Sequence, residues 1–158
     1  MKKTKSITRD KFTWLSYLML GYYGYFINGL GPVMPFLRAE LQMSYTLSSF
    51  HFSAFAIGML LAGLGGDRIA RRYGRRRTFW NGVFGMAGGV MLLLVGYHPV
   101  LTIGGTFLMG TIGSLLLVIM PAVLSDRYGP QRAIAISEAN VVASLCGGLA
   151  PVAIGFFV

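Results

Sequence analysis

Long apolar runs constrain this chain more than any other feature of its sequence. There are five of them, each about 20 residues or longer, and the connections between them are too short to hold a soluble domain. A membrane-spanning helix needs roughly 20 predominantly apolar residues. The sequence therefore predicts an all-α membrane protein, with a basic tail at residues 1–11 followed by a multi-spanning helical bundle over 12–158. The predicted helices are 12–37, 45–66, 78–97, 100–124 and 133–157.

The chain has few charged residues for a soluble protein of its size. Hydrophobic residues make up 54% of its 158 residues and charged residues only 12%, whereas an ordinary soluble domain carries about 25% charge. A net charge of +9 would also suit a nucleic-acid ligand, but the basic residues lie between the apolar runs. We therefore expect the chain to be embedded in a lipid bilayer, and we expect no nucleic acid as its partner.

The positions of the basic residues predict the orientation. Thirteen of the 14 Lys and Arg residues fall in the amino-terminal tail, the second connection or the fourth connection, and only Arg38 lies in the first. Positive residues accumulate in cytoplasmic segments. The sequence thus predicts a plasma (cell inner) membrane protein with a cytoplasmic amino terminus, and anionic lipids as partners at the cytoplasmic face.

No catalytic or cofactor-binding pattern is present in the sequence. Cys146 is the only cysteine, and there is no histidine pair at helical spacing, no phosphate-binding glycine loop with lysine and no carboxylate cluster. We therefore expect neither an enzyme nor a bound metal or cofactor.

Small residues recur every three or four positions along the apolar segments. In lipid, such rows let helix backbones approach closely, in a static bundle as well as in a moving one. On the last segment the row contains Gly147, Pro151 and Gly155, and the proline also predicts a bend. Pro32 and Pro35 are expected to close the first helix.

Asn28, Tyr25 and Glu138 are candidates for a solute or ion pathway. Ionisable residues are costly in hydrocarbon, so Glu138 can serve to bind a proton or a cation. It can equally pair with an arginine, or simply reach the interface. Asn28 can bind a polar solute or hydrogen-bond another helix, and Tyr25 can line a cavity or fill space.

The sequence from 63 to 77 reads Gly-Leu-Gly-Gly-Asp-Arg-Ile-Ala-Arg-Arg-Tyr-Gly-Arg-Arg-Arg. It resembles the signature loop between the second and third helices of the major facilitator superfamily of secondary transporters, G-x-x-x-D-R/K-x-G-R/K-R/K. The matching residues are Gly63, Asp67 and Arg68 in the first half and Gly74, Arg75 and Arg76 in the second.

The match contains four more residues than the family pattern, which is about one helical turn. A second register aligns residues 71–76 with the pattern and replaces its aspartate by Arg71. We favour the first register, because it keeps an aspartate at the cytoplasmic end of the second helix. It also places Asp67 and Arg71 at i and i+4, where they can pair.

The resemblance implies that this loop is a conformational latch. In the family, the aspartate at the position of Asp67 interacts with the other half of the transporter, while the arginines hold the turn. Asp126, in the fourth connection, is a candidate partner at the same edge. The glycines around Pro151 resemble the antiporter motif only loosely, because Ala150 precedes the proline, and antiport is not implied.

Members of the family typically have twelve helices in two halves, so this chain resembles a partial fold with five of them. We expect an amino-terminal fragment whose partners are the missing carboxy-terminal half and an unknown small solute, transported by alternating access. The chain alone is then inactive. The alternative is a small membrane scaffold or partner subunit that transports nothing, and the fold does not indicate which solute is carried.

Overall fold

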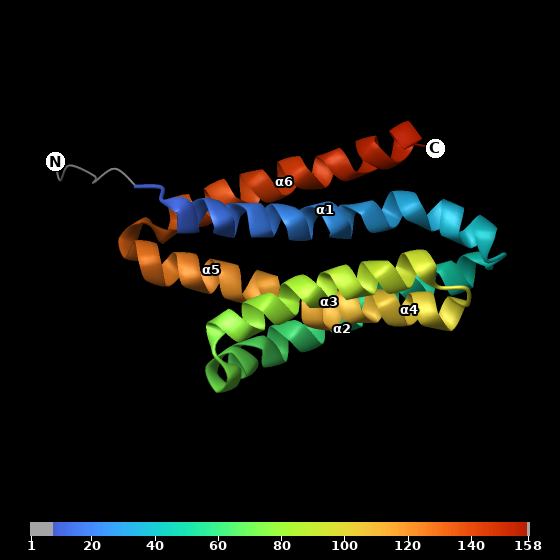
Figure 1. Ribbon diagram of the computed structural model, residues 1–158, viewed down its shortest axis with the longest axis horizontal. Coiled ribbons are helices and arrows are strands. Elements are labelled where there is room, and N and C mark those ends of the chain that lie inside the picture. Colours follow the sequence, from blue (N-terminus) through green and yellow to red (C-terminus); the bar gives the residue numbers. More distant parts are fainter. Residues whose placement is uncertain (1–7, 158) are drawn as a thin grey trace.

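The structure is a computed structural model and describes residues 8–157. Within this range the chain forms helices joined by short connections, and no strand is present (Figure 1). The helices are α1 (Lys11–Glu40), α2 (Tyr45–Tyr73), α3 (Arg75–Val95), α4 (Pro99–Leu108), the π-helix η1 (Met109–Gly113), α5 (Leu115–Tyr128), the 3₁₀-helix η2 (Gly129–Gln131) and α6 (Arg132–Phe157). The protein is all-α, as the sequence predicts.

Three helical stretches are long and apolar enough to cross a membrane. They are Tyr45–Tyr73, Arg75–Val95 and Pro99–Phe156, and the last of these includes α4 to α6. Helix α1 is not among these three stretches. The protein is therefore an all-α membrane protein, while the number of five spans stays a prediction.

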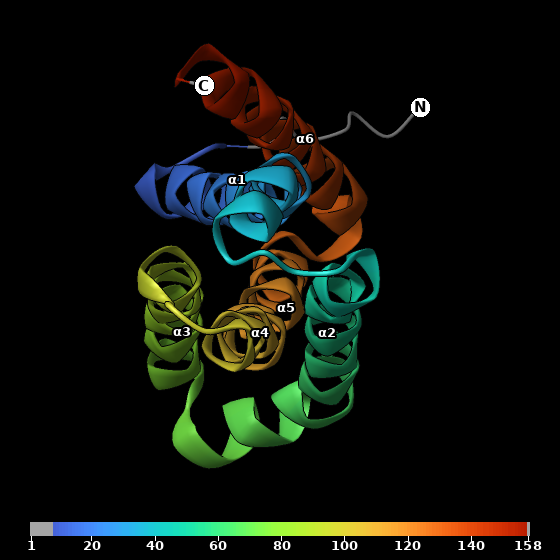
Figure 2. The same ribbon diagram turned by 90° about the vertical axis from the view of Figure 1, so that its right-hand side faces the viewer.

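The long helices run alternately up and down the bundle (Figure 1). Helix α1 packs mainly against α6, and these two lie side by side along much of their length. The path formed by α4, η1 and α5 lies between α2 and α3, as the end-on view in Figure 2 shows. Consecutive helices are antiparallel because the connections between them are only a few residues long.

Most basic residues gather at one end of the bundle. Gly74, η2 and the start of α1 lie together at this end, and residues 41–44 and 96–98 lie at the opposite end (Figure 1). We call residues 8–11, 67–77 and 125–132 the basic edge. The structure thus brings together three segments that are far apart in the sequence.

Two buried apolar clusters hold the bundle together. The first joins α1 to α2, α3 and η1, with Met86 and Met109 almost fully buried. The second joins α1 to α5 and α6 near the basic edge, around Tyr17 and Leu124. Flexible methionines fill the irregular space beside helix backbones that lie close together.

Glycines allow several of these close approaches. A methyl group added at Gly24 of α1 would lie 2.5 Å from the carbonyl oxygen of Ala143 on α6. One added at Gly110 of η1 would meet the backbone carbonyl group of Phe55 on α2 closer than 3.0 Å. The small-residue rows therefore mark real helix contacts at these positions.

Two predicted connections are shorter in the structure than the sequence suggests. Helix α2 continues through residues 67–73 to end at Tyr73, and α5 continues to Tyr128, so only Gly74 separates α2 from α3. The predicted loop at 67–77 is thus largely helical. The physical reason is that residues 67–73 contain no glycine or proline, and their charges can pair along a helix.

The prediction that Pro32 and Pro35 close the first helix is wrong. Helix α1 continues through both prolines to Glu40. Each proline removes one backbone donor, and the remaining hydrogen bonds and the packing of Met34 and Leu37 keep the helix intact. Figure 1 shows the carboxyl-terminal part of α1 turning away from the direction of its first part, as expected of a proline bend.

The sequence gives no sign of the π-helix η1 in the fourth long helix. Here Ser114 donates its backbone N–H to the carbonyl of Met109, five residues back. Gly110 lies against α2, and Gly113 lies against Met86 of α3. The wider turn thus places two glycines toward two different neighbouring helices, an arrangement that depends on tertiary contacts.

Candidate functional site: the basic edge

The residues that match the family loop lie on the last turns of α2, on Gly74 and on the first turn of α3. Asp67 and Arg71 form the ion pair that their i and i+4 spacing predicts. Both side chains are well exposed, and a pair of this kind contributes little to stability. The pair places a carboxylate and a guanidinium group side by side near the end of α2.

Gly74 makes the turn between α2 and α3. Its φ of 86° lies in the left-handed region, which is strained for residues that have a Cβ atom. Its backbone N–H donates to the carbonyl of Ala70, and its own carbonyl accepts from the Thr78 hydroxyl at 3.0 Å. A single glycine therefore ends one helix and starts the next.

Arg75 connects α3 to α5. Its guanidinium group lies 2.6 Å from a carboxylate oxygen of Asp126. Both side chains are more than half exposed, so the pair contributes little to the stability of the fold. Asp126, the candidate carboxylate partner at this edge, thus contacts Arg75 of the turn.

The other residues of the matched pattern form no ion pair with another described residue. Arg68 and Arg76 are exposed. A methyl group at Gly63 would meet no atom within 4 Å among the described residues, so no helix packs closely against this glycine in the described part of the protein. The reason is that Gly63 lies on an exposed face of α2.

A second group of polar contacts joins α6 to the start of α1. Glu138 accepts a hydrogen bond of 2.9 Å from Nε of Arg9 and one of 2.8 Å from the hydroxyl of Tyr17. Its other carboxylate oxygen lies 2.5 Å from the Arg9 guanidinium group. This hydrogen bond with Glu138 raises the pKa of Arg9 above its usual value. Of the roles considered from the sequence, the structure shows the pairing of Glu138 with an arginine.

Asp10 forms the amino-terminal cap of α1. Its carboxylate accepts hydrogen bonds from the hydroxyl and the backbone N–H of Thr13, at 2.8 and 3.0 Å, and also pairs with Arg127 of α5. The Thr13 hydroxyl, followed by its backbone N–H, lowers the pKa of Asp10, with a further contribution from Arg127. Negative charge is favourable at a helix amino terminus, so the cap and the ion pair support the same ionised state.

Tyr128 completes the contacts between α1 and the α5–α6 connection. Its hydroxyl lies 2.5 Å from the Thr13 hydroxyl and donates to the carbonyl of Thr8 at 3.1 Å. Beside this contact, Arg9 pairs with Glu138 of α6, and Asp10 pairs with Arg127 of α5. Sequence reasoning missed this arrangement, because its partners lie more than 100 residues apart and no local pattern connects them.

Asn28 and Tyr25 lie on α1 beside α6. The Asn28 amide donates to the carbonyl of Gly24 at 2.8 Å, and a methyl group on Gly147 of α6 would lie 2.6 Å from that amide. Asn28 is exposed, and the half-buried Tyr25 packs edge-on against Phe26. The structure thus places an amide and a phenol near the middle of α1, while their role in a pathway stays a prediction.

Pro151 and Gly155 lie on α6 beyond this contact. A methyl group at Gly155 would meet no atom within 4 Å in the described part of the chain, and Pro151 is exposed within a continuous helix. Only Gly147 of the three residues makes a close helix contact here. Within residues 8–157, no group of three His, Cys, Asp or Glu side chains is placed to hold a metal ion.

Comparison with known proteins identifies the family. The family model of the Major Facilitator Superfamily matches residues 13–158. A curated protein from Bacillus subtilis (strain 168), named "Uncharacterized transporter YycB", is 28% identical over 127 residues, which cover 78% of this chain and 31% of that protein. The chain thus spans less than a third of the length of this relative. No solved structure gives a significant match. Because the family model covers nearly the whole chain, the chain belongs to the major facilitator superfamily.

Proposed function

We propose that this chain is the amino-terminal part of a secondary transporter that carries a small solute across the plasma membrane by alternating access. The observation that carries the proposal is the family match over residues 13–158. The transporter name of the relative from Bacillus subtilis and the three apolar helical stretches support it. In such proteins the solute is held between two halves that move relative to each other.

Binding of the solute would require a second half of the protein as well as the half described here. The chain spans 31% of the length of its relative, and solute held between two halves needs both. We therefore expect these 158 residues to be inactive on their own. Asn28 and Tyr25 on α1 are the described residues that we propose line the pathway, since each presents a hydrogen-bonding group on a helix that is otherwise mostly apolar.

The basic edge would face the cytoplasm and act as a latch. This orientation follows from the distribution of basic residues. Asp67 is exposed and is held near the end of α2 by Arg71, which leaves its second carboxylate oxygen free for contact with another part of the transporter. The ion pair between Arg75 and Asp126 joins the start of α3 to α5 at this edge.

Cysteine accessibility tests the alternating-access proposal without knowledge of the solute. The full-length protein would carry Asn28→Cys in a background without its other cysteines, including Cys146→Ala. A membrane-impermeant maleimide should label this cysteine both in intact cells and in inverted vesicles, because the pathway opens to each side in turn. Arg132→Cys, at the basic edge, is the matched control and should react only in inverted vesicles. Labelling of position 28 from one side alone would contradict alternating access.

A further inference from the structure

Two hollows adjoin at the basic edge and share Arg76 and Trp80 of α3 in their walls. The larger, of about 460 Å³, lies between α1, α3 and α5, and the smaller, of about 410 Å³, lies beside the turn between α2 and α3. Neither contains a residue of the Asn28 region or Glu138. They are therefore separate from the proposed solute pathway, although Arg75, Arg76 and Arg77 in their walls also belong to the basic edge that we propose as the latch.

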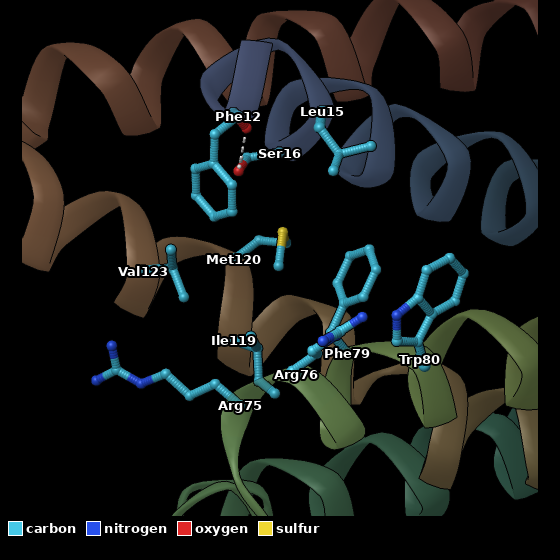
Figure 3. A pocket seen from close by; sticks show the side chains of 10 residues that line it. All are labelled: Phe12, Leu15, Ser16, Arg75, Arg76, Phe79, Trp80, Ile119, Met120 and Val123. Atoms are coloured by element: carbon cyan, nitrogen blue, oxygen red, sulfur yellow. Dashed lines mark hydrogen bonds between the residues drawn. The ribbon is translucent and has the colours of Figure 1, made fainter. Parts of the chain in front are cut away.

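The larger hollow is apolar. Figure 3 shows Phe12 and Leu15 pointing from α1 toward Met120 of α5 and Phe79 of α3. Apart from two arginines and Ser16, its lining consists of apolar and aromatic side chains. The hydroxyl of Ser16 donates to the carbonyl of Phe12, so the chain satisfies that polar group itself. A hollow with this lining suits a hydrocarbon chain rather than a polar solute.

The smaller hollow is lined by hydrogen-bond donors. Its residues are Tyr73, Arg76, Arg77, Trp80 and Asn81. In the described part of the chain, neither hollow has an acidic residue in its wall, and no ion pair or hydrogen bond joins Arg76 or Arg77 to another described residue. Arg71, near the end of α2, and Arg75, which precedes Arg76 on α3, are by contrast paired with carboxylates. Arg76 and Arg77 thus bring two positive charges without a described ion-pair partner to the wall of the hollow beside the apolar one.

We propose that this pair of hollows binds one anionic phospholipid, with its phosphate at Arg76 and Arg77 and an acyl chain in the apolar hollow. An amphipathic ligand could fill both spaces at once, because the same two side chains, Arg76 and Trp80, border both of them. Trp80 is half exposed at the boundary between the charged end of α3 and its apolar part, a depth that tryptophan favours in membranes. Basic pockets between membrane helices are suited to anionic headgroups. The proposal does not depend on which solute the protein carries.

Native mass spectrometry of the full-length protein in detergent tests the proposal. Phosphatidylglycerol is the anionic probe, and phosphatidylcholine is its zwitterionic counterpart. Wild-type protein should retain phosphatidylglycerol about tenfold more strongly than phosphatidylcholine, and R76Q/R77Q should lose about that factor, because each basic residue near the membrane surface contributes appreciably to anionic lipid binding. The matched control K11Q/R132Q removes the same charge from exposed positions at the same edge, outside both hollows, and should retain phosphatidylglycerol within about twofold of wild type.

Two further experiments distinguish a phospholipid from other occupants of the two hollows. Glycerol 3-phosphate, which has the anionic group without acyl chains, should not displace the lipid. A phosphatidylglycerol with a photoreactive group on its acyl chain should cross-link to peptides that contain residues 12–16, 79–80 or 119–123. Three results would each overturn the proposal. The first is an equal loss of phosphatidylglycerol binding in R76Q/R77Q and K11Q/R132Q, and the second is displacement of the lipid by glycerol 3-phosphate. The third is cross-linking confined to other peptides, which is expected if another protein segment fills the apolar hollow.

Discussion

Gly110→Val is expected to abolish the folded yield of the full-length protein, whereas Gly104→Val leaves it close to that of wild type. Gly110 lies in η1 with the backbone of Phe55 on α2 closer to its missing Cβ than any side chain could tolerate. A backbone atom cannot move aside as a flexible side chain can, so the added methyl groups would force α2 and the fourth long helix apart. Overpacking of this kind costs about 3 kcal/mol or more.

Gly104 is the matched control because it lies six residues earlier on the same helical path and has no atom of residues 8–157 within 4 Å of its missing Cβ. Both substitutions introduce the same β-branched residue into a helix. The difference in stability between the two variants therefore reports the contact of Gly110 with α2. Size-exclusion profiles and thermal unfolding midpoints in detergent provide the measurement. Equal stability of the two variants would show that α2 and η1 are not packed as this structure places them.

Glu138→Leu is expected to destabilise the protein by about 1–3 kcal/mol, and Glu138→Gln by much less. The carboxylate of Glu138 is the acceptor for the hydroxyl of Tyr17, a residue that is 2% exposed. Leucine leaves that buried hydroxyl without an acceptor, whereas the glutamine side-chain oxygen can still accept its hydrogen bond. Both variants lose the exposed pairing with Arg9, which contributes little.

Thermal unfolding of the two full-length variants separates a structural role of Glu138 from a role in an ion pathway. A structural role predicts a clearly lower unfolding midpoint for the leucine variant and a midpoint close to that of wild type for the glutamine variant. If both variants unfold like wild type, the contact with Tyr17 does not stabilise the bundle. Glu138 would then return to the list of candidates for binding a proton or a cation.

The sequence predicts the parts of this structure that depend on local patterns. Apolar runs locate the long helices, and the i and i+4 spacing of Asp67 and Arg71 predicts their ion pair. The predicted ends of the helices are less accurate, because no helix-breaking residue separates the charged residues 67–73 from α2. Proline is a poor guide at α1, since packing outweighs the hydrogen bonds that Pro32 and Pro35 remove.

Contacts between distant segments account for what the sequence does not reveal. The π-helix depends on where α2 and α3 lie relative to Gly110 and Gly113. The pairing of Arg9 with Glu138 depends on the packing of α1 against α6, and nothing near Arg9 in the sequence indicates it. The two hollows around Trp80 likewise combine residues of several helices. These features follow from tertiary structure rather than from any segment alone.

The central claim is that the basic edge controls one side of an alternating-access pathway. The rate of maleimide labelling at Asn28→Cys, measured from both sides with and without Asp67→Asn, tests it most directly. Loss of a latch at the basic edge favours the conformation that is open at that edge. The population of the conformation open at the opposite side then falls by the same amount. We therefore predict faster labelling through the basic edge and correspondingly slower labelling from the opposite side. Unchanged rates, or rates that rise or fall together on both sides, would contradict the account.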